Sequence, residues 1–382
     1  MSEPLPIKLL RCGVEFFPAL IDAISQAKHE IFLETYIFQN DIVGHAIATA
    51  LEEAAQRGIA THLMIDGFGS KEYPESRLAS LRKSGVQIRI YRPGFLNFRF
   101  LGTGIRRLHR KLAVIDRQLV FVGGINILDD FVDANPAPRY DFAVAIGGTV
   151  AADVHDAVAR LWWLVSWSQF KRRGTGRSDR LRVPSSNDGP LPGSARLILR
   201  DNLRHRRAIE SEYLKAIRSA TDRIIIANAY FLPGRKLLRA LLGAAARGVS
   251  VDLILQGRVE YFIQHFASQH LYRNLIGAGI NIHLYKPAHM HAKVAVIDSD
   301  WATIGSSNLD PFSLQLAREA NIFVLDASFT KLLANELLSA IQLDSDKIGV
   351  ENWHCIPRYR TLLMRLCYGI VRFTQHFATR RH

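Results

Sequence analysis

Short apolar and β-branched runs alternate with helical stretches along most of the chain. Ile224–Ile226 and Val251–Leu255 are two such runs. In each half the pattern predicts a helix, an apolar strand, a helix, a strand, a short helix, a strand and then a further pair of strands. This alternation indicates the α/β fold class, with buried mixed sheets.

The second half of the chain repeats the first. Glu34–Phe38 is echoed by Asn228–Leu232, and Ala55–Ile59 by Ala245–Val249, where a glycine suits the C-cap of a helix before the next strand. A basic stretch rich in Gly, Ser and Pro separates the two copies and is typical of a linker. We therefore predict a first repeat over residues 1–170, a linker over 171–195, a second repeat over 196–345 and a C-terminal tail over 346–382.

Charge and composition narrow the class of partner. The chain has 382 residues, a net charge of +14 and a pI near 9.9, which points to nucleic acid or an acidic membrane surface. Its three cysteines show no C-x2-C spacing, which disfavours a disulfide framework or zinc site and fits a reducing compartment. We expect no signal peptide and no membrane-spanning helix, so any membrane contact would be peripheral. The cysteines are Cys12, Cys355 and Cys367.

Two polar motifs with identical spacing carry the candidate chemistry. Each motif has a His, a Lys two residues later, an Asp five residues after the Lys and an Asn ten residues after the Asp. Two copies with the same offsets are far more specific than a lone H-x-K. The motif residues are His109, Lys111, Asp116 and Asn126 in the first half, and His291, Lys293, Asp298 and Asn308 in the second.

Strand geometry places the His and Lys of each motif on one face, because alternate residues of a strand point the same way. If the halves meet about a pseudo-twofold axis, one pocket would hold two His, two Lys and two Asn side chains. Two ammonium groups can neutralise phosphate oxygens without a metal ion. One imidazole can attack phosphorus while the other protonates the leaving alkoxide. Spacing alone does not decide which histidine takes which role.

The paired motifs resemble those of the phospholipase D superfamily over almost the whole chain. The resemblance implies two pseudo-twofold-related phospholipase D-like α/β sandwich domains that share one site, and a covalent phosphohistidine. It implies His109 as nucleophile and His291 as acid/base, with both lysines and both asparagines holding the phosphate. Asp116 and Asp298 belong to the signature, but we expect them to be structural, since they follow the strand in a turn. Asp141 and Glu319 match the family's acids that orient the catalytic imidazoles.

Further features resemble the bacterial cardiolipin synthases within that superfamily. These are Glu34–Phe38, Asp66–Ser70 and Gly305–Asp310, although Pro311 and Phe312 stand where many members have an Arg. The resemblance implies a short synthase without N-terminal membrane helices, peripheral on the cytoplasmic face of a bacterial inner membrane. It would join two phosphatidylglycerol molecules into cardiolipin and release glycerol. No cofactor is implied, and a zinc site at His289 and His291 is disfavoured by the neighbouring Lys293.

Three segments each allow two interpretations, one as a membrane-binding element and one as an ordinary packed or solvated part of the fold. The first half carries 12 extra residues within Gly94–Leu108, with three Phe and three Arg, which form a lid at the lipid surface or a packed loop. Arg160–Phe170 is Trp-rich and predicts either a core helix or an interfacial one. Tyr359–His382 predicts a basic amphipathic helix for an anionic bilayer, with a solvated charged face as the alternative.

Other activities share the same motifs. Water as acceptor would make the chain a phospholipase D hydrolase, and phosphatidylethanolamine as donor would make it a related phosphatidyltransferase. A nuclease of the same superfamily would bind DNA with strong salt dependence. Nucleic acid is the less favoured partner, because the basic residues are interleaved with Phe, Leu and Trp. The oligomeric state does not follow from the sequence.

Overall fold

The computed structural model describes residues 7–93, 107–131, 137–170, 194–200, 207–310, 317–349 and 356–380. Most of the proposed lid and most of the linker, together with Cys355, Pro311 and Phe312, lie outside these residues. The first half contains β1 (Ile7–Arg11), α1 (Cys12–Gln26), β2 (Glu30–Thr35), α2 (Ile42–Gln56), β3 (Ala60–Asp66), α3 (Glu75–Lys83), β4 (Gln87–Tyr91), β5 (Leu112–Ile115), β6 (Leu119–Gly123), β7 (Phe142–Ile146) and α4 (Thr149–Phe170).

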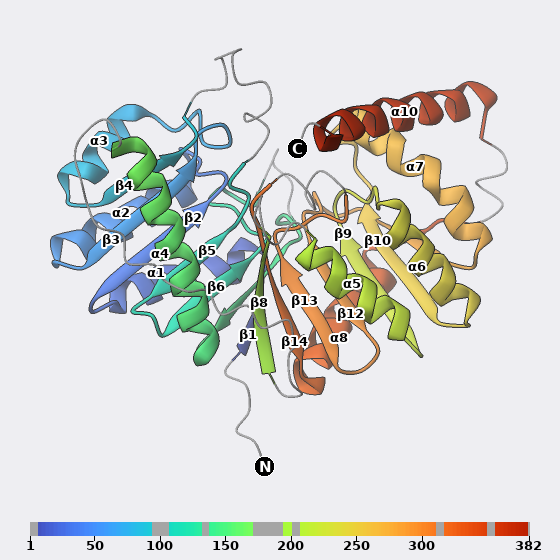
Figure 1. Ribbon diagram of the computed structural model, residues 1–382, viewed down its shortest axis with the longest axis horizontal. Coiled ribbons are helices and arrows are strands. Elements are labelled where there is room, and N and C mark those ends of the chain that lie inside the picture. Colours follow the sequence, from blue (N-terminus) through green and yellow to red (C-terminus); the bar gives the residue numbers. More distant parts are fainter. Residues whose placement is uncertain are drawn as a thin grey trace.

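The second half follows the same order of elements. It contains β8 (Ser194–Arg200), α5 (Ala208–Ser219), β9 (Arg223–Asn228), α6 (Arg235–Ala246), β10 (Ser250–Gln256), α7 (Phe262–Gly277), β11 (Asn281–Tyr285), β12 (Lys293–Ile297), β13 (Trp301–Gly305), β14 (Glu319–Leu325), α8 (Ala327–Leu343) and β15 (Ser345–Lys347). A final helix, α10 (Arg358–Arg380), lies across α7 (Figure 1).

The two sheets have matching strand orders. The first runs β1-β7-β6-β5-β2-β3-β4, and the second runs β8-β14-β13-β12-β9-β10-β11 with β15 added at its far edge. In each sheet three strands are parallel and the rest are antiparallel, such as β2 with β3 and β2 with β5. The expected α/β class with mixed sheets is therefore confirmed. The edge strands β1 and β8, which pair with β7 and β14, were not foreseen.

The sheets pack side by side at the centre of the molecule, as Figure 1 shows. One hydrophobic core draws on both halves, including Val122 and Val144 from the first and Val294 and Ile322 from the second. The helices α4 and α8 cover this inner region, whereas α1–α3 and α5–α7 cover separate outer cores. A shared apolar core fixes the halves against each other, because separating them would expose that surface to water.

The Trp-rich stretch and the C-terminal stretch, for which the sequence left two interpretations, lie largely within the described residues. In α4, Trp162 is buried, while Trp163 and Trp167 are exposed, so this helix is both a core helix and a source of exposed aromatic surface. The C-terminal stretch forms the amphipathic helix α10, whose inner face buries Met364 and Cys367. Among the described helices, none combines the length and apolar character required to cross a bilayer.

Candidate active site

Short backbone ladders between the halves position both motif histidines. Leu108 pairs with Arg318, and Met290 pairs with Tyr140, each as a parallel bridge. As a result the His109 amide donates to the Arg318 carbonyl at 3.0 Å, and the His291 amide donates to the Tyr140 carbonyl at 2.8 Å. Each histidine precedes its strand on an extended segment rather than lying on the strand, which corrects the simple strand picture. The segment is held by the opposite half instead.

Because of these bridges, each histidine contacts an acidic residue of the other half. Arg318 is followed by Glu319, and the Glu319 carboxylate lies 3.0 Å from His109 Nδ1. Tyr140 is followed by Asp141, whose carboxylate lies 2.6 Å from His291 Nδ1. Both acids are almost fully buried. A carboxylate that accepts from Nδ1–H fixes the tautomer and leaves Nε2 of each imidazole for other chemistry.

The two motif lysines are buried beside the histidines. Lys111 Nζ donates to the His109 carbonyl at 2.8 Å, and Lys293 Nζ donates to the His291 carbonyl. Burial lowers the pKa of Lys111 to about 7, against the attraction of Glu319. Burial lowers the pKa of Lys293 to about 8, against the attraction of Asp141 and Glu319. An anion placed between these groups would restore their preference for the charged form.

Burial lowers the pKa values of the two histidines to different extents. It lowers the pKa of His109, although Glu319 partly offsets this. Burial lowers the pKa of His291 much further, and the positive charges of Lys293, Lys111 and Arg139 add to that effect. Burial raises the pKa of Asp141 to about 7. The charges of both lysines act on both imidazoles, so the four motif side chains share one electrostatic site.

The motif asparagines lie just beyond β6 and β13, both nearly buried. The Asn126 side-chain oxygen accepts from the Ile37 amide at 3.2 Å, which leaves its NH2 group as the outward donor. The side-chain oxygen of Asn308 is buried with no hydrogen-bond partner among the described residues. The positions of both asparagines suit donation to a phosphate. Among the described residues, no hydrogen bond joins either side-chain amide to a motif lysine.

Asp116 and Asp298 lie at the opposite ends of β5 and β12 from the histidines. The Asp116 carboxylate accepts from the backbone amides of residues 28, 29 and 30, at 2.7 to 3.0 Å. Asp298 accepts in the same way from residues 221, 222 and 223. Both have positive φ, 53° and 51°. They tie the end of each motif strand to the segment at the start of β2 or β9, and they lie at the other end of that strand from the motif histidine.

Some residues that contact the motif side chains were not predicted from the sequence. The ring of Tyr36 lies 4.9 Å from that of His109, and Lys111 Nζ lies 5.4 Å from the Tyr36 ring. Ser306 Oγ donates to the Glu319 carboxylate at 2.5 Å. The matching residue is Gly124, where a Cβ would lie 2.4 Å from the Asp141 carboxylate. The repeat Glu34–Phe38 with Asn228–Leu232 was the one sequence signal that could have pointed to Tyr36.

A buried ion pair supports only the first half of the site. Arg110 Nη2 lies 2.7 Å from Glu34, and both side chains are nearly buried. At the matching places the second half has Asn228 and Ala292, and the Asn228 side-chain oxygen accepts from the Leu309 amide. The two motifs are therefore equal in spacing and unequal in surroundings.

Two matched α/β halves that share one His–Lys site define the class of phospholipase D-like proteins. The family described as "Cardiolipin synthase, PLD-like domain" matches residues 20–148 and 213–341. Cardiolipin synthase B of Salmonella typhimurium is 39% identical, over 91% of this chain and 84% of its own length. Cardiolipin synthase B of Escherichia coli K12 is 36% identical, over 90% and 82% respectively. The chain therefore belongs to the cardiolipin synthase family of the phospholipase D superfamily.

Solved structures support the fold. Phosphatidylserine synthase of Haemophilus influenzae has a TM-score of 0.68 at 15% identity, covering 97% of this chain and 93% of that one. Polyphosphate kinase of Porphyromonas gingivalis has a TM-score of 0.61 at 16% identity, covering 97% of this chain and 53% of that one. At these identities the likeness concerns the fold alone.

Proposed function

We propose that the protein is a cardiolipin synthase that transfers a phosphatidyl group from one phosphatidylglycerol to a second through a phosphohistidine. The products are cardiolipin and glycerol. The observation that carries the proposal is the pair of crossed His–acid contacts, His109 with Glu319 and His291 with Asp141, beside two buried lysines. The substrate class is taken from the similar proteins, which are cardiolipin synthases.

In the first step, His109 Nε2 forms a bond to phosphorus and the bond from phosphorus to the glycerol oxygen breaks. That oxygen keeps the electron pair and takes a proton from His291 Nε2. In the second step, a hydroxyl of the other phosphatidylglycerol gives its proton to His291 and bonds to phosphorus, while the bond to His109 breaks. The exchange of one phosphodiester for another is nearly energy-neutral, so no nucleotide is required.

The bound phosphodiester prepares His291 for its acid role. The positive charges of Lys293, Lys111 and Arg139 all contribute to the low pKa of His291, after burial itself. A phosphate anion between the lysines would neutralise that positive field, so the pKa of His291 would rise and Asp141 would stabilise the imidazolium. Both lysines, with Asn126 and Asn308, would stabilise the charge on the phosphoryl oxygens.

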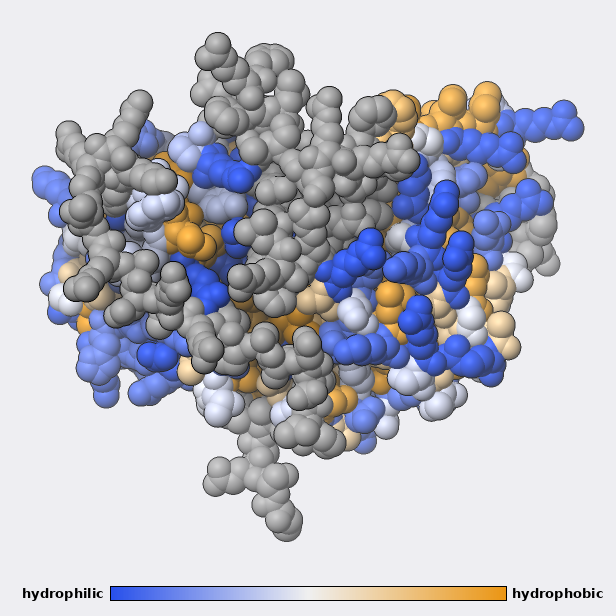
Figure 2. All heavy atoms as spheres, viewed as in Figure 1, coloured by the Kyte–Doolittle hydropathy of each residue, from blue (hydrophilic) through white to orange (hydrophobic). Residues whose placement is uncertain are grey.

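We further propose that the protein associates peripherally with an anionic bilayer through α10, on the cytoplasmic face of a bacterial inner membrane. One stripe of this helix exposes apolar side chains, each at least half exposed. Exposed Arg358, Arg360 and Arg365 flank it. The patch is visible at the upper right of Figure 2, over α10. A basic helix with an apolar stripe binds anionic lipid through both features. The stripe is Tyr359, Leu362, Leu366, Ile370 and Phe373.

Purified protein with phosphatidylglycerol vesicles, followed by mass spectrometry of the lipids, tests the activity. We expect cardiolipin and glycerol in equal amounts. Protein quenched with detergent at neutral pH should carry a phosphatidyl group on a His109 peptide, because the P–N bond is labile in acid. His109→Ala and His291→Ala should each reduce turnover by at least a thousandfold, because each removes one side of the chemistry. Glu53→Gln, an exposed change on α2, serves as the control with normal turnover.

Each alternative predicts a different outcome of the same assay. Phosphatidic acid as the sole lipid product would replace the proposal with a hydrolase. Cardiolipin formed only when phosphatidylethanolamine is added would change the donor. Cleavage of DNA, with no lipid product, would favour the nuclease.

A further inference from the structure

Arg110 directly follows His109 but lies on the other side of the extended segment that carries both. Successive side chains of an extended segment point to opposite sides, so Arg110 shares its side with Leu108 and Leu112. These leucines are buried in the core that the two halves share. Arg110 Nη2 lies 2.7 Å and 2.9 Å from the two oxygens of the Glu34 carboxylate, and both side chains are nearly buried. An ion pair is thus buried directly behind the segment that carries His109.

In the first half, this ion pair stands where backbone pairing stops. The ladder between β2 and β5 ends at the pair Glu34–Leu112, and among the described residues no backbone hydrogen bond joins residues 109–111 to β2. The Glu34–Arg110 contact makes a link from β2 to this segment instead. It fixes the segment to its own half, while the bridge to Arg318 fixes it to the other half.

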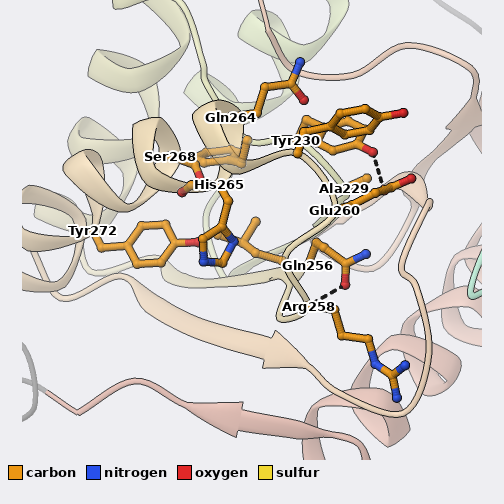
Figure 3. Close-up of a pocket in the computed structure, with 12 residues that line it drawn as sticks. Ala229, Tyr230, Gln256, Arg258, Glu260, Gln264, His265, Ser268 and Tyr272 are labelled. Carbon is orange, nitrogen blue, oxygen red and sulfur yellow. Dashed lines mark hydrogen bonds between the residues drawn. The ribbon is translucent and has the colours of Figure 1, made fainter. Parts of the chain in front are cut away.

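In the second half, the matching segment is held by backbone and neutral groups. The Ala229 amide donates to the Ala292 carbonyl at 3.1 Å, directly beyond the ladder between β9 and β12. Gln256 donates from Nε2 to the Met290 carbonyl at 3.5 Å. The side-chain oxygen of Gln256 accepts from the Arg258 amide at 3.2 Å, which Figure 3 shows as a dashed line. A backbone bond therefore does in this half what the ion pair does in the other.

Asp66, at the end of β3, holds the same segment of the first half from its other end. The Asp66 carboxylate accepts from the Leu108 amide at 2.9 Å and lies 3.7 Å from the Arg107 guanidinium. Leu108 precedes His109 and Arg110 follows it. The two acidic contacts therefore fix the chain on either side of His109.

The ion pair also lies close to the residue that precedes the acid partner of His109. Burial raises the pKa of Glu34, and the positive charges of Arg110 and Arg318 oppose that effect. The Arg318 carbonyl accepts from the His109 amide at 3.0 Å, and Glu319 is the next residue. A displacement of the ion pair would therefore shift the backbone of both His109 and Glu319, whose contact orients the imidazole.

We propose that the Glu34–Arg110 ion pair positions His109, holding its imidazole at attacking distance from phosphorus and so favouring it over His291 as the nucleophile. The inference rests on the proposed function, in which His109 forms the covalent bond. A buried ion pair adds little stability over apolar side chains of similar volume, but it has a fixed direction as well as a fixed distance. A displacement of about 1 Å at a reacting group can slow a reaction roughly a hundredfold. Glu34 and Arg110 are therefore positioning residues that act through His109.

The double variant Glu34→Leu with Arg110→Met separates position from stability. It replaces the ion pair by apolar side chains of similar volume, so the melting temperature should stay close to the wild-type value. Single-turnover release of radiolabelled glycerol from phosphatidylglycerol vesicles measures the first chemical step. We expect the rate of this step to fall roughly tenfold to a hundredfold, because the imidazole is displaced. KM in steady-state turnover should stay unchanged, because both side chains face away from the substrate.

Two further variants and one spectroscopic measurement accompany the rate. Arg196→Met with Glu212→Leu makes the same double change in a partly buried pair between β8 and α5, and it should keep the wild-type rate. Arg110→Lys keeps the charge but loses the planar guanidinium, so its rate should lie between those of the wild-type protein and the Glu34–Arg110 double variant. The NMR resonances of the His109 ring nitrogens should shift in that double variant and stay unchanged in the control.

The outcomes separate this inference from the function beneath it. A folded double variant with the wild-type rate and unchanged His109 resonances would overturn the positioning role and leave the synthase standing. A raised KM with an unchanged single-turnover rate would also overturn it, because the pair would then act on substrate binding. If the double variant does not fold, Arg110→Lys decides, since a wild-type rate contradicts the inference and a slower one supports it. No glycerol release by the wild-type protein would overturn the proposed function itself.

Discussion

At the residue scale, the two buried lysines should make the proposed phosphate binding sensitive to pH. Burial lowers the pKa of Lys111 to about 7 and that of Lys293 to about 8. Before substrate binds, each lysine is charged below its pKa and neutral above it. In the proposed mechanism the charged form binds the phosphodiester, so affinity should be highest on the acid side of these values and should fall as pH rises through them.

We therefore expect kcat/KM for phosphatidylglycerol to fall between pH 7 and pH 9, by up to roughly tenfold per pH unit for each lysine that loses its proton. Lys111→Arg keeps the charge at every pH in this range and should move the alkaline limb upward, though with a lower plateau. Initial rates from pH 6 to pH 9.5 measure both effects. A flat alkaline limb in the wild-type protein would contradict the prediction.

Asp116 makes a different prediction because it serves the fold. Burial raises its pKa, but three backbone N–H groups outweigh this and lower the pKa below its ordinary value. Such a group contributes stability above the unfolded pKa, near 4, and the contribution is lost as pH falls through the folded value. Asp116→Asn should lower the free energy of unfolding at pH 7 by about 2 kcal/mol, with the difference vanishing at low pH.

Urea unfolding of the wild-type protein and Asp116→Asn at pH 7 and pH 3 measures this difference. Asp298→Asn is the matched variant in the second half, with the same three-amide pattern, and should behave alike. Loss of turnover in fully folded Asp116→Asn would contradict a purely structural role. The expectation that both aspartates are structural came from their place in a turn after the motif strand.

At the scale of elements, α10 has an inner face packed on α7 and an outer face exposed to solvent. Its inner face packs on α7, where the Arg360 guanidinium lies 5.9 Å from the Phe266 ring. The start of α7 and the segment before it expose Val259, Tyr261, Phe262 and Ile263, each close to half exposed or more. Tyr261 also lines a small pocket between the ends of β9 and β10 and the start of α7. The stripe on α10 and the start of α7 would therefore present one combined apolar surface to the bilayer.

The double variant Leu362→Ser with Leu366→Ser should weaken binding to phosphatidylglycerol vesicles by roughly a hundredfold or more, since each side chain buried in lipid contributes about 1.5 to 3 kcal/mol. Both residues are exposed, so the fold should be unaffected. Leu343→Ser, at the exposed end of α8, is the control. Vesicle sedimentation measures binding, and equal binding by all three proteins would remove α10 from the membrane surface.

The sequence predicted some elements better than others, for physical reasons. The helices and strands up to each motif strand pair were predicted because periodicity reports burial directly. The inner strands β7 and β14 and the helix α8, which follow those pairs, were not predicted. The edge strands β1 and β8 were missed, since β1 is a short five-residue run and β8 begins where a basic linker was expected. His109 and Lys111 were placed on a strand, whereas their segment is extended and held by the opposite half. Alternation along one chain cannot reveal a ladder formed between distant segments.

At the scale of the whole molecule, the site exists only where the halves meet. The matched spacing of the motifs predicted a shared site, and the family resemblance picked out Asp141 and Glu319. The crossing itself, with each acid serving the other half's histidine, depends on the bridges Leu108–Arg318 and Met290–Tyr140. Tyr36 and Arg139 could not be predicted as neighbours of the histidines, because their positions depend on tertiary packing.

Because the acids cross within one chain, a mixture of two inactive variants should stay inactive. His109→Ala retains the second motif and His291→Ala retains the first, but neither protein can assemble a complete pair of imidazoles from its own residues. The shared core of the two sheets would have to separate before halves of different chains could combine, which exposes a large apolar surface. Mixed and co-expressed variants should therefore show no more cardiolipin formation than either alone. Recovery of substantial activity on co-expression would mean that active sites form between chains, with the halves exchanged.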